Sequence, residues 1–227
     1  MRPNWFKQLW QEFKVAAPAA MWLLPLLTVG GLLLLLDTQT DESSRFEYVA
    51  MIVEIVFPLG VLYVANGLIL REREKKTLAF VAVRSSLSIL WLRRLTAVFV
   101  GALFCLGLLL LVYRWFYLSF SVTKMLLAFF AVALALTSLS SMISLLTKEM
   151  NAGFLIGTLW WAFSLMNPKA MISLFGPYLY LFYFWFNIRE SLVLDRWLAS
   201  KFSLLGMATV LIFVSIQMLR STERFVA

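Results

Sequence analysis

The sequence predicts an all-α polytopic membrane protein with six transmembrane helices, an amino-terminal interfacial helix and a re-entrant or interfacial hairpin before the last span. Hydrophobic residues make up 62% of the 227 residues and charged residues only 14%. The charged residues gather between long apolar runs, which is typical of membrane-spanning helices. Strands of an outer-membrane barrel would instead alternate polar and apolar residues over about ten positions. A single transmembrane domain over residues 1–227 is therefore expected.

Residues 1–14 form a candidate interfacial helix. Aromatic and apolar side chains recur there at helical spacing, while the basic and amide side chains mostly occupy the other face. Such a helix lies in the plane of the membrane interface. It acts either as an anchor for the first span or as a connecting helix that packs beside the cytoplasmic loop and transmits motion. The apolar set is Trp5, Phe6, Leu9, Trp10 and Phe13, and the polar set is Lys7, Gln8, Gln11 and Lys14.

Six apolar runs follow, most of them near the length of about 20 residues that crosses the hydrocarbon layer. We expect spans at residues 15–36, 48–70, 95–113, 125–146, 153–166 and 202–219, of which the fifth is short. Lys and Arg concentrate in the amino-terminal arm and after the second span, whereas the loop after the first span carries mostly acidic residues. The excess of basic residues places both termini and a loop at 71–94 on the cytoplasmic side of the cell membrane.

Residues 167–201 admit two interpretations. The aromatic-rich stretch 170–188 is long enough for a seventh span, and the distribution of basic residues does not decide between six and seven spans. We favour a re-entrant or interfacial hairpin that is broken at Gly176-Pro177, with its Tyr and Trp side chains at the level of the lipid headgroups. An exposed amphipathic return would then lead from Arg189 to Lys201.

The residue types that are missing from the sequence exclude several kinds of chemistry. The chain has no histidine, which argues against His-dependent proteases, paired haem ligands and imidazole proton relays. Cys105 is the only cysteine, so no disulfide can form within the chain. No P-loop string occurs, so a partner chain would have to bind any nucleotide phosphate. The net charge of +8 flanks apolar runs, which indicates anionic lipid headgroups and not nucleic acid as the partner. We expect neither enzymatic activity nor a cofactor in this chain.

A run of alternating charge stands between the second and third predicted spans. Thr77 is a candidate cap for a short helix, and the apolar residues after it would give that helix contacts. Alternating charges can pair with a soluble protein and fix the orientation of a complex. The simpler alternative is that these charges stay in water and only hold the topology of the spans. The candidate coupling residues are Arg71, Glu72, Arg73, Glu74, Lys75, Lys76, Thr77, Leu78 and Phe80.

The stretch from Leu70 to Ser88 resembles the segment after the second span in ABC-2 type permeases, where a charged cluster, a Thr-Leu pair and a turn with Ser or Pro precede the third span. The plan of the whole chain is similar to that family as well. The resemblance implies an ATP-driven exporter with a second permease subunit, identical or related. It also implies separate ATPase chains, which carry ATP and magnesium and dock on segment 71–88. The expected cargo is amphipathic or hydrophobic: a peptide, an antibiotic or a lipid-like molecule.

Glu54 is the one acidic residue clearly inside a predicted span, and a carboxylate there faces a cavity or pairs with a basic group. Because Glu54 lies only about two turns from the outer end of the span, access to water or a structural hydrogen bond is the alternative. We take Glu54 and Asn66 as candidate pathway residues, although an interhelical hydrogen bond is the commoner role of a membrane asparagine. If an ion gradient supplied the energy, Glu54 would be the coupling carboxylate of a secondary transporter. A further alternative is a membrane scaffold or sensor that recruits a soluble partner through the 71–94 loop.

Overall fold

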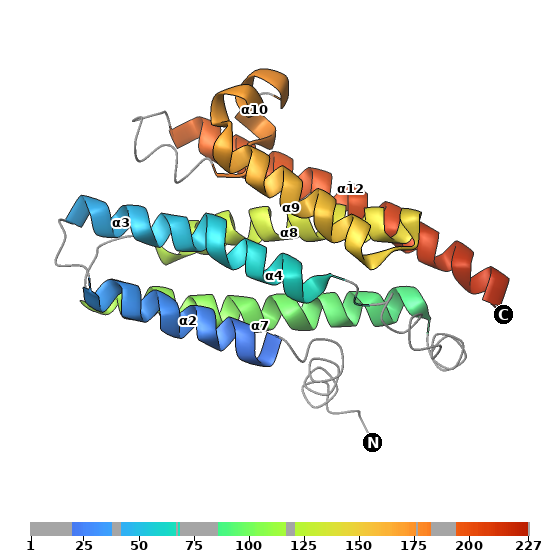
Figure 1. The fold of residues 1–227 in the computed structure, drawn as a ribbon, viewed down its shortest axis with the longest axis horizontal. Helices are drawn as coiled ribbons and strands as arrows, with labels where there is room; N and C mark the ends of the chain where they lie inside the picture. Colours follow the sequence, from blue (N-terminus) through green and yellow to red (C-terminus); the bar gives the residue numbers. More distant parts are fainter. Residues whose placement is uncertain are drawn as a thin grey trace.

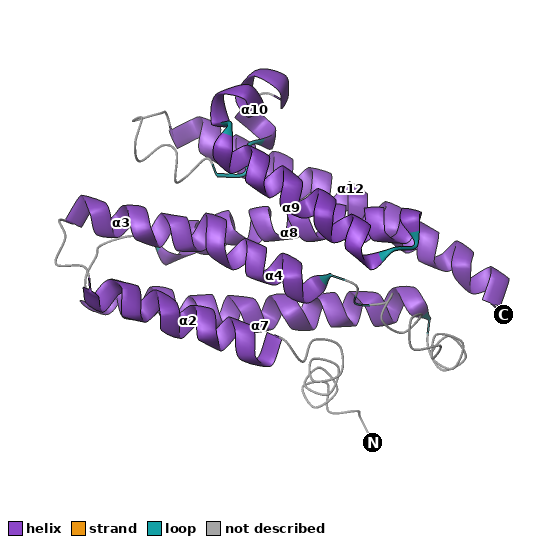
Figure 2. Ribbon diagram, viewed as in Figure 1, coloured by secondary structure: helices purple, strands orange, loops and turns teal. Residues whose placement is uncertain are grey.

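A computed structural model describes residues 20–37, 42–66, 68, 86–116, 121–175, 177–182 and 194–226. These residues are almost entirely helical, and no strand occurs among them (Figures 1 and 2). In chain order the elements are α2 (Ala20–Asp37), α3 (Glu42–Met51), the π-helical turn η1 (Ile52–Val56), α4 (Phe57–Ala65), α7 (Leu87–Phe116), α8 (Val122–Thr147), α9 (Met150–Met166), α10 (Pro168–Phe175), the 3-10 turn η2 (Pro177–Leu179) and α12 (Leu194–Val226).

The long helices lie roughly side by side, with α8 at the centre of the bundle (Figure 1). Helices α4, α7, α9 and α12 all contact α8, and α2 packs on α4 and α7. The α8–α9 turn, the start of α7 and the carboxyl terminus lie toward one end of the bundle, on the right in Figure 1. The start of α3, helix α10 and the start of α12 lie toward the other end. Successive helices therefore run in alternating directions.

Four helices are long and apolar enough to cross a membrane among the residues that the structure describes. They are Phe46–Ala65, Leu87–Trp115, Val122–Thr147 and Trp197–Ser221. Helix α9 is apolar but has only 17 residues, and α2 has 18. The predicted all-helical class is confirmed for the described residues, and the four apolar helices suggest a membrane-embedded protein. The count of six spans and the re-entrant hairpin stay predictions.

Two helices, α7 and α12, begin eight residues before the spans that the sequence predicts. Helix α7 begins at Leu87 and not at residue 95, so the last part of the predicted 71–94 loop is helical. Its buried stripe repeats at helical spacing and continues through a basic residue, which explains why the helix does not stop at the charges. The stripe consists of Leu87, Leu90, Trp91, Arg94, Leu95 and Val98.

Helix α12 likewise begins at Leu194 and not at residue 202, so part of the predicted 167–201 hairpin belongs to the last long helix. Lys201 is fully buried there and does not lie on an exposed return. The buried stripe Trp197, Ser200, Lys201, Leu204 and Ala208 has helical spacing. The predicted interfacial helix at 1–14, the candidate coupling residues 71–80 and hairpin residues 183–193 lie outside the described residues.

Helices α8 and α9 approach each other closely at the turn that joins them. Lys148 ends α8 with a φ of 61°, in the left-handed region where a chain commonly leaves a helix. On α9, a Cβ atom at Gly153 would overlap the hydroxyl of Ser144 and the backbone carbonyl oxygen of Ser140. Gly157 faces Leu62 of α4, to which a Cβ atom would come within 3.1 Å. Both glycines therefore serve packing within this chain.

Candidate functional site: a buried ion pair between the second and last long helices

Proline explains an irregularity in the helix that carries Glu54. Pro58 has no backbone N–H, and its ring crowds the carbonyl group four residues earlier, which is that of Glu54. The backbone adopts the π-helical turn Ile52–Val56 just before it, and the N–H of Phe57 donates to the carbonyl oxygen of Ile52. Turns of this kind are rare and occur frequently at functional sites. The turn is buried, so its backbone geometry depends on neighbours and not on solvent.

Helix α9 supplies one of those neighbours. The indole Nε1 of Trp161 donates a hydrogen bond of 3.1 Å to the carbonyl oxygen of Ile55, inside the π-helical turn. The ring of Trp161 also meets the ring of Phe182 edge to face, with 6.3 Å between the ring centroids. Trp161 therefore connects α9, the π-helical turn and the short segment 180–182.

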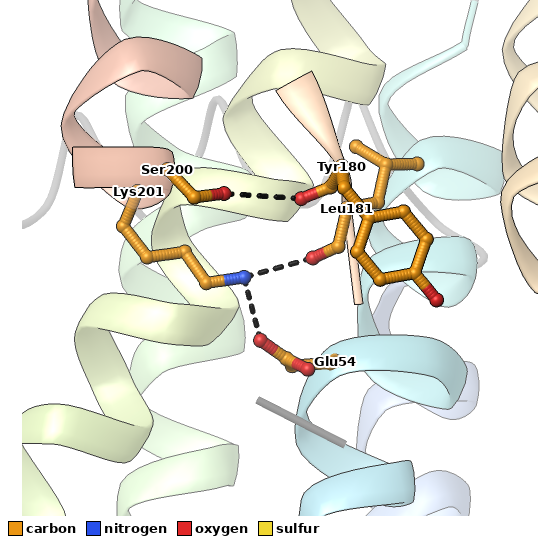
Figure 3. A network of polar contacts seen from close by, with 5 residues as sticks. All are labelled: Glu54, Tyr180, Leu181, Ser200 and Lys201. Carbon is orange, nitrogen blue, oxygen red and sulfur yellow. Dashed lines mark hydrogen bonds and ion pairs between the residues drawn. The ribbon is translucent and has the colours of Figure 1, made fainter. Parts of the chain in front are cut away.

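Glu54 and Lys201 form an ion pair in the interior of the bundle (Figure 3). The Nζ atom of Lys201 lies 2.5 Å from Oε1 of Glu54, and both side chains are 0% exposed. The same Nζ atom donates a hydrogen bond of 2.8 Å to the carbonyl oxygen of Leu181. One ammonium group thus joins the second long helix, the last long helix and segment 180–182.

Segment 180–182 needs this support because its backbone is not helical. In an apolar medium a carbonyl group without a hydrogen-bond donor costs several kcal/mol. Two adjacent side chains of α12 supply the donors: Ser200 Oγ donates to the carbonyl oxygen of Tyr180 at 3.2 Å, and Lys201 Nζ donates to that of Leu181 (Figure 3). Tyr180, Leu181 and Phe182 are all fully buried. The polar groups of α12 therefore hold an irregular segment inside the protein.

The carboxylate of Glu54 and the ammonium group of Lys201 carry opposite charges, so each compensates the other. Removing one partner of a buried pair typically costs about 3–5 kcal/mol, because the remaining charge is left without compensation. Among the described residues no group of three or more His, Cys, Asp or Glu side chains could hold a metal ion. The site can therefore connect the second and last long helices, and this connection depends on the charges of Glu54 and Lys201.

The sequence predicted two pathway residues, and the structure does not bring them together. Glu54 pairs with a basic group, which was one of its expected roles. Asn66 lies about three turns further along the same helix, where the backbone leaves the helical conformation with φ −61° and ψ 128°. The Oδ1 atom of Asn66 is buried and has no hydrogen-bond partner within the described part of the chain.

Sequence reasoning missed Lys201. It is the one basic residue between Trp197 and Leu219, so it was the obvious intrahelical candidate for the counter-charge of Glu54. Its position next to the apolar run instead suggested a place at the water interface. Comparison with models of protein families, with curated proteins and with solved structures finds no match for this chain.

Proposed function

We propose that this chain is the transmembrane subunit of an ABC-2 type exporter. It would move an amphipathic or hydrophobic molecule out of the cytoplasm or the inner leaflet with energy from a separate ATPase subunit. The observation that carries the proposal is the charged segment 71–88, with its Thr77-Leu78 pair and its serine-bearing turn. Support comes from its place in the chain, between the long apolar helices Phe46–Ala65 and Leu87–Trp115.

In the proposed architecture α2 and α9 complete a set of six spans. At about 1.5 Å per residue, their 18 and 17 residues reach roughly 26 Å, slightly less than the hydrocarbon thickness of about 30 Å. A local thinning of the bilayer accommodates such a difference at modest cost. The alternating helix directions support an even number of crossings and place the end of α8 and the carboxyl terminus together (Figure 1).

The proposed mechanism is alternating access. Two permease subunits, identical or related, form the pathway, and two ATPase chains with ATP and magnesium bind the 71–88 segments. The Glu54–Lys201 pair would transmit a movement of the second long helix to α12, because Glu54 belongs to the helix that leads toward the charged segment. A displacement of that helix would act directly on α12 and on segment 180–182.

A gradient-driven secondary transporter is the second candidate function. A fully buried carboxylate in a π-helical turn favours it, since intramembrane carboxylates commonly mark ion pathways. Against it, Lys201 already balances the charge of Glu54 without any bound ion. A scaffold that recruits a soluble partner would use the same charged segment but would transport nothing.

Purification in mild detergent separates these functions. We expect the chain to co-purify with a stoichiometric ATP-binding protein and to support transport that requires ATP. Purification of the chain alone, together with transport that follows an imposed proton gradient and ignores ATP, would establish the secondary transporter instead. Stable recruitment of a soluble protein without any transport would establish the scaffold.

Replacing Leu78 and Phe80 together by aspartate tests the coupling segment. New carboxylates at a contact with a partner would be desolvated without compensation. For the aspartate variant we expect normal membrane abundance, but the ATPase should either no longer bind or no longer drive transport. The double variant Glu72→Lys and Glu74→Lys should weaken binding of the ATPase by placing like charges at the contact. The measurement is the ratio of ATPase to permease after purification, with transport and orientation checked in each variant. Unchanged binding and ATP-driven transport in the aspartate variant would contradict the assignment.

Thiol labelling tests the proposed topology. In a Cys105→Ser background, Ser221→Cys near the carboxyl terminus should react with a membrane-impermeant maleimide only after the membrane is opened. Tyr178→Cys lies in η2, which contacts α10 and α12, and its parent side chain is 52% exposed, so it should react in intact cells. The expected difference is at least tenfold in labelling rate, because the bilayer blocks the reagent. Outside labelling at residue 221 would rule out an even number of spans.

A further inference from the structure

Two adjacent arginines of α7 lie in different environments. The side chain of Arg93 is exposed, whereas Arg94 belongs to the buried stripe of the helix and is only 5% exposed. The Nη1 atom of Arg94 donates a buried hydrogen bond of 2.7 Å to the backbone carbonyl oxygen of Leu68. This bond joins α7 to the chain just beyond α4.

The chain at this point needs a donor from elsewhere. A buried backbone carbonyl group outside a helix has no partner in the helix, and a cation near the carboxyl end of a helix is favourable. Helix α4 ends at Ala65, and Asn66 turns the backbone away from the helical path. The bond from the guanidinium group to this carbonyl is a buried, charge-assisted hydrogen bond, and breaking such a bond is costly. The contact between Arg94 and Leu68 is therefore stiff.

We propose that Arg94 is a positioning residue that ties the exit of the second long helix to α7, so that a displacement of the chain beyond Leu68 moves α7 with it. This inference rests on the proposed function and deepens it. It names the residue through which a movement imposed by the ATPase on segment 71–80 reaches the third span.

The short chain between Leu68 and the charged segment makes the connection through Arg94 effective. Only two residues lie between Leu68 and Arg71, so this stretch of chain spans at most about 11 Å when it is fully extended. A movement that carries Arg71 beyond this reach would therefore pull on Leu68. Arg94 lies about two turns into α7, so the force acts on the body of the helix and not on its first turn. The Glu54–Lys201 pair lies about three to four turns away along the second helix and forms a separate connection.

The test uses the complex of permease and ATPase in lipid nanodiscs, in a Cys105→Ser background. Spin labels are placed at Ile89→Cys on α7 and Leu146→Cys on α8, whose parent side chains are 50% and 57% exposed. Both positions lie near the end of the bundle where α7 starts and α8 ends. The distance between the labels is measured without nucleotide and with ATP, magnesium and vanadate.

We expect ATP and vanadate to shift the distance when Arg94 is present. Arg94→Met should abolish the shift while the ATPase still binds and hydrolyses ATP, and Arg93→Met, one position away on the exposed face, should retain it. Arg94→Lys should restore at least half of the shift, because an ammonium group can still donate to the Leu68 carbonyl. A purely structural role would lower stability without separating hydrolysis from helix movement. If Arg94→Met does not accumulate, Arg94→Gln is measured in its place.

Two results would overturn the inference. One is a full shift in Arg94→Met or its Gln substitute, and the other is an unshifted distance in the parent complex while it hydrolyses ATP. If no ATPase co-purifies with the parent chain, the proposed function fails and the inference falls with it. The purification step shows that case before any distance is measured, so the two failures are distinguishable.

Discussion

Lys201→Met should destabilise the protein by about 3–5 kcal/mol, because it leaves the carboxylate of Glu54 fully buried without its counter-charge. The loss includes the hydrogen bond that Lys201 donates to the carbonyl of Leu181. Glu54 can lower the cost by taking up a proton, since a neutral carboxylic acid is cheaper to bury than a carboxylate. The expected result is therefore a clear drop in the midpoint of thermal unfolding in detergent, measured by size-exclusion chromatography of heated samples.

Three variants make the measurement specific to the pair. Arg220→Met removes an exposed cation from the same helix and should change stability by no more than about 0.5 kcal/mol. Ser200→Ala leaves the carbonyl of Tyr180 without its donor and should cost about 1–3 kcal/mol. Combining Lys201→Met with Glu54→Gln removes both charges and should recover much of the stability lost in Lys201→Met alone. Wild-type stability of Lys201→Met would contradict the buried pair.

The neutral double variant also bears on function. A secondary transporter that uses Glu54 needs a carboxylate at this position, so the variant would lose gradient-driven transport completely. An ATP-driven exporter that uses the pair only to connect helices should keep a substantial part of its ATP-dependent transport. The same protein sample therefore distinguishes a structural role of Glu54 from an ion-coupling role.

The sequence predicted the helices better than it predicted where they start. Runs of apolar residues located the long helices, because each helix in lipid must carry its own apolar surface. Charged residues were taken as ends of helices, and this displaced the starts of α7 and α12. Arg94 and Lys201 both lie within buried stripes, where Arg94 donates to a backbone carbonyl group and Lys201 meets a carboxylate, each from a distant part of the chain. Such compensation is tertiary, so local patterning does not report it.

The candidate site was predictable in part. Glu54 was identifiable because an acidic residue within an apolar run is costly. Pro58, four residues after Glu54, was a signal of an irregular helix that the sequence analysis did not use. The partner of Glu54 depends on how the last helix packs against the second. The identity of the two backbone carbonyls that Ser200 and Lys201 satisfy depends on the path of segment 180–182, which no local rule specifies.

Gly153→Ala should destabilise the protein by about 2–3 kcal/mol, because overpacking of a tight contact typically costs about 1–3 kcal/mol and the backbone here cannot yield easily. The added methyl group would overlap the Ser144 hydroxyl, which can rotate, and the Ser140 carbonyl oxygen, which is fixed in α8. Helix α9 would have to move away from α8 over its whole first turn. Thermal unfolding and membrane abundance measure the effect.

The same substitution at Gly206 of α12 is the matched control, because nothing lies within 4 Å of a Cβ atom there. Alanine is the better helix former by about 1 kcal/mol, so Gly206→Ala should be neutral or slightly stabilising. Gly157→Ala should fall between the two, since its tightest contact would be the flexible end of Leu62, and Ser140 Cβ would lie at an ordinary contact distance of 3.5 Å. We therefore expect the Gly206→Ala variant to be the most stable of the three, Gly157→Ala to be intermediate and Gly153→Ala to be the least stable. Equal stability of the Gly153 and Gly206 variants would show that α8 and α9 are not in close contact, and the short apolar helix α9 would then lose its main support in the bundle.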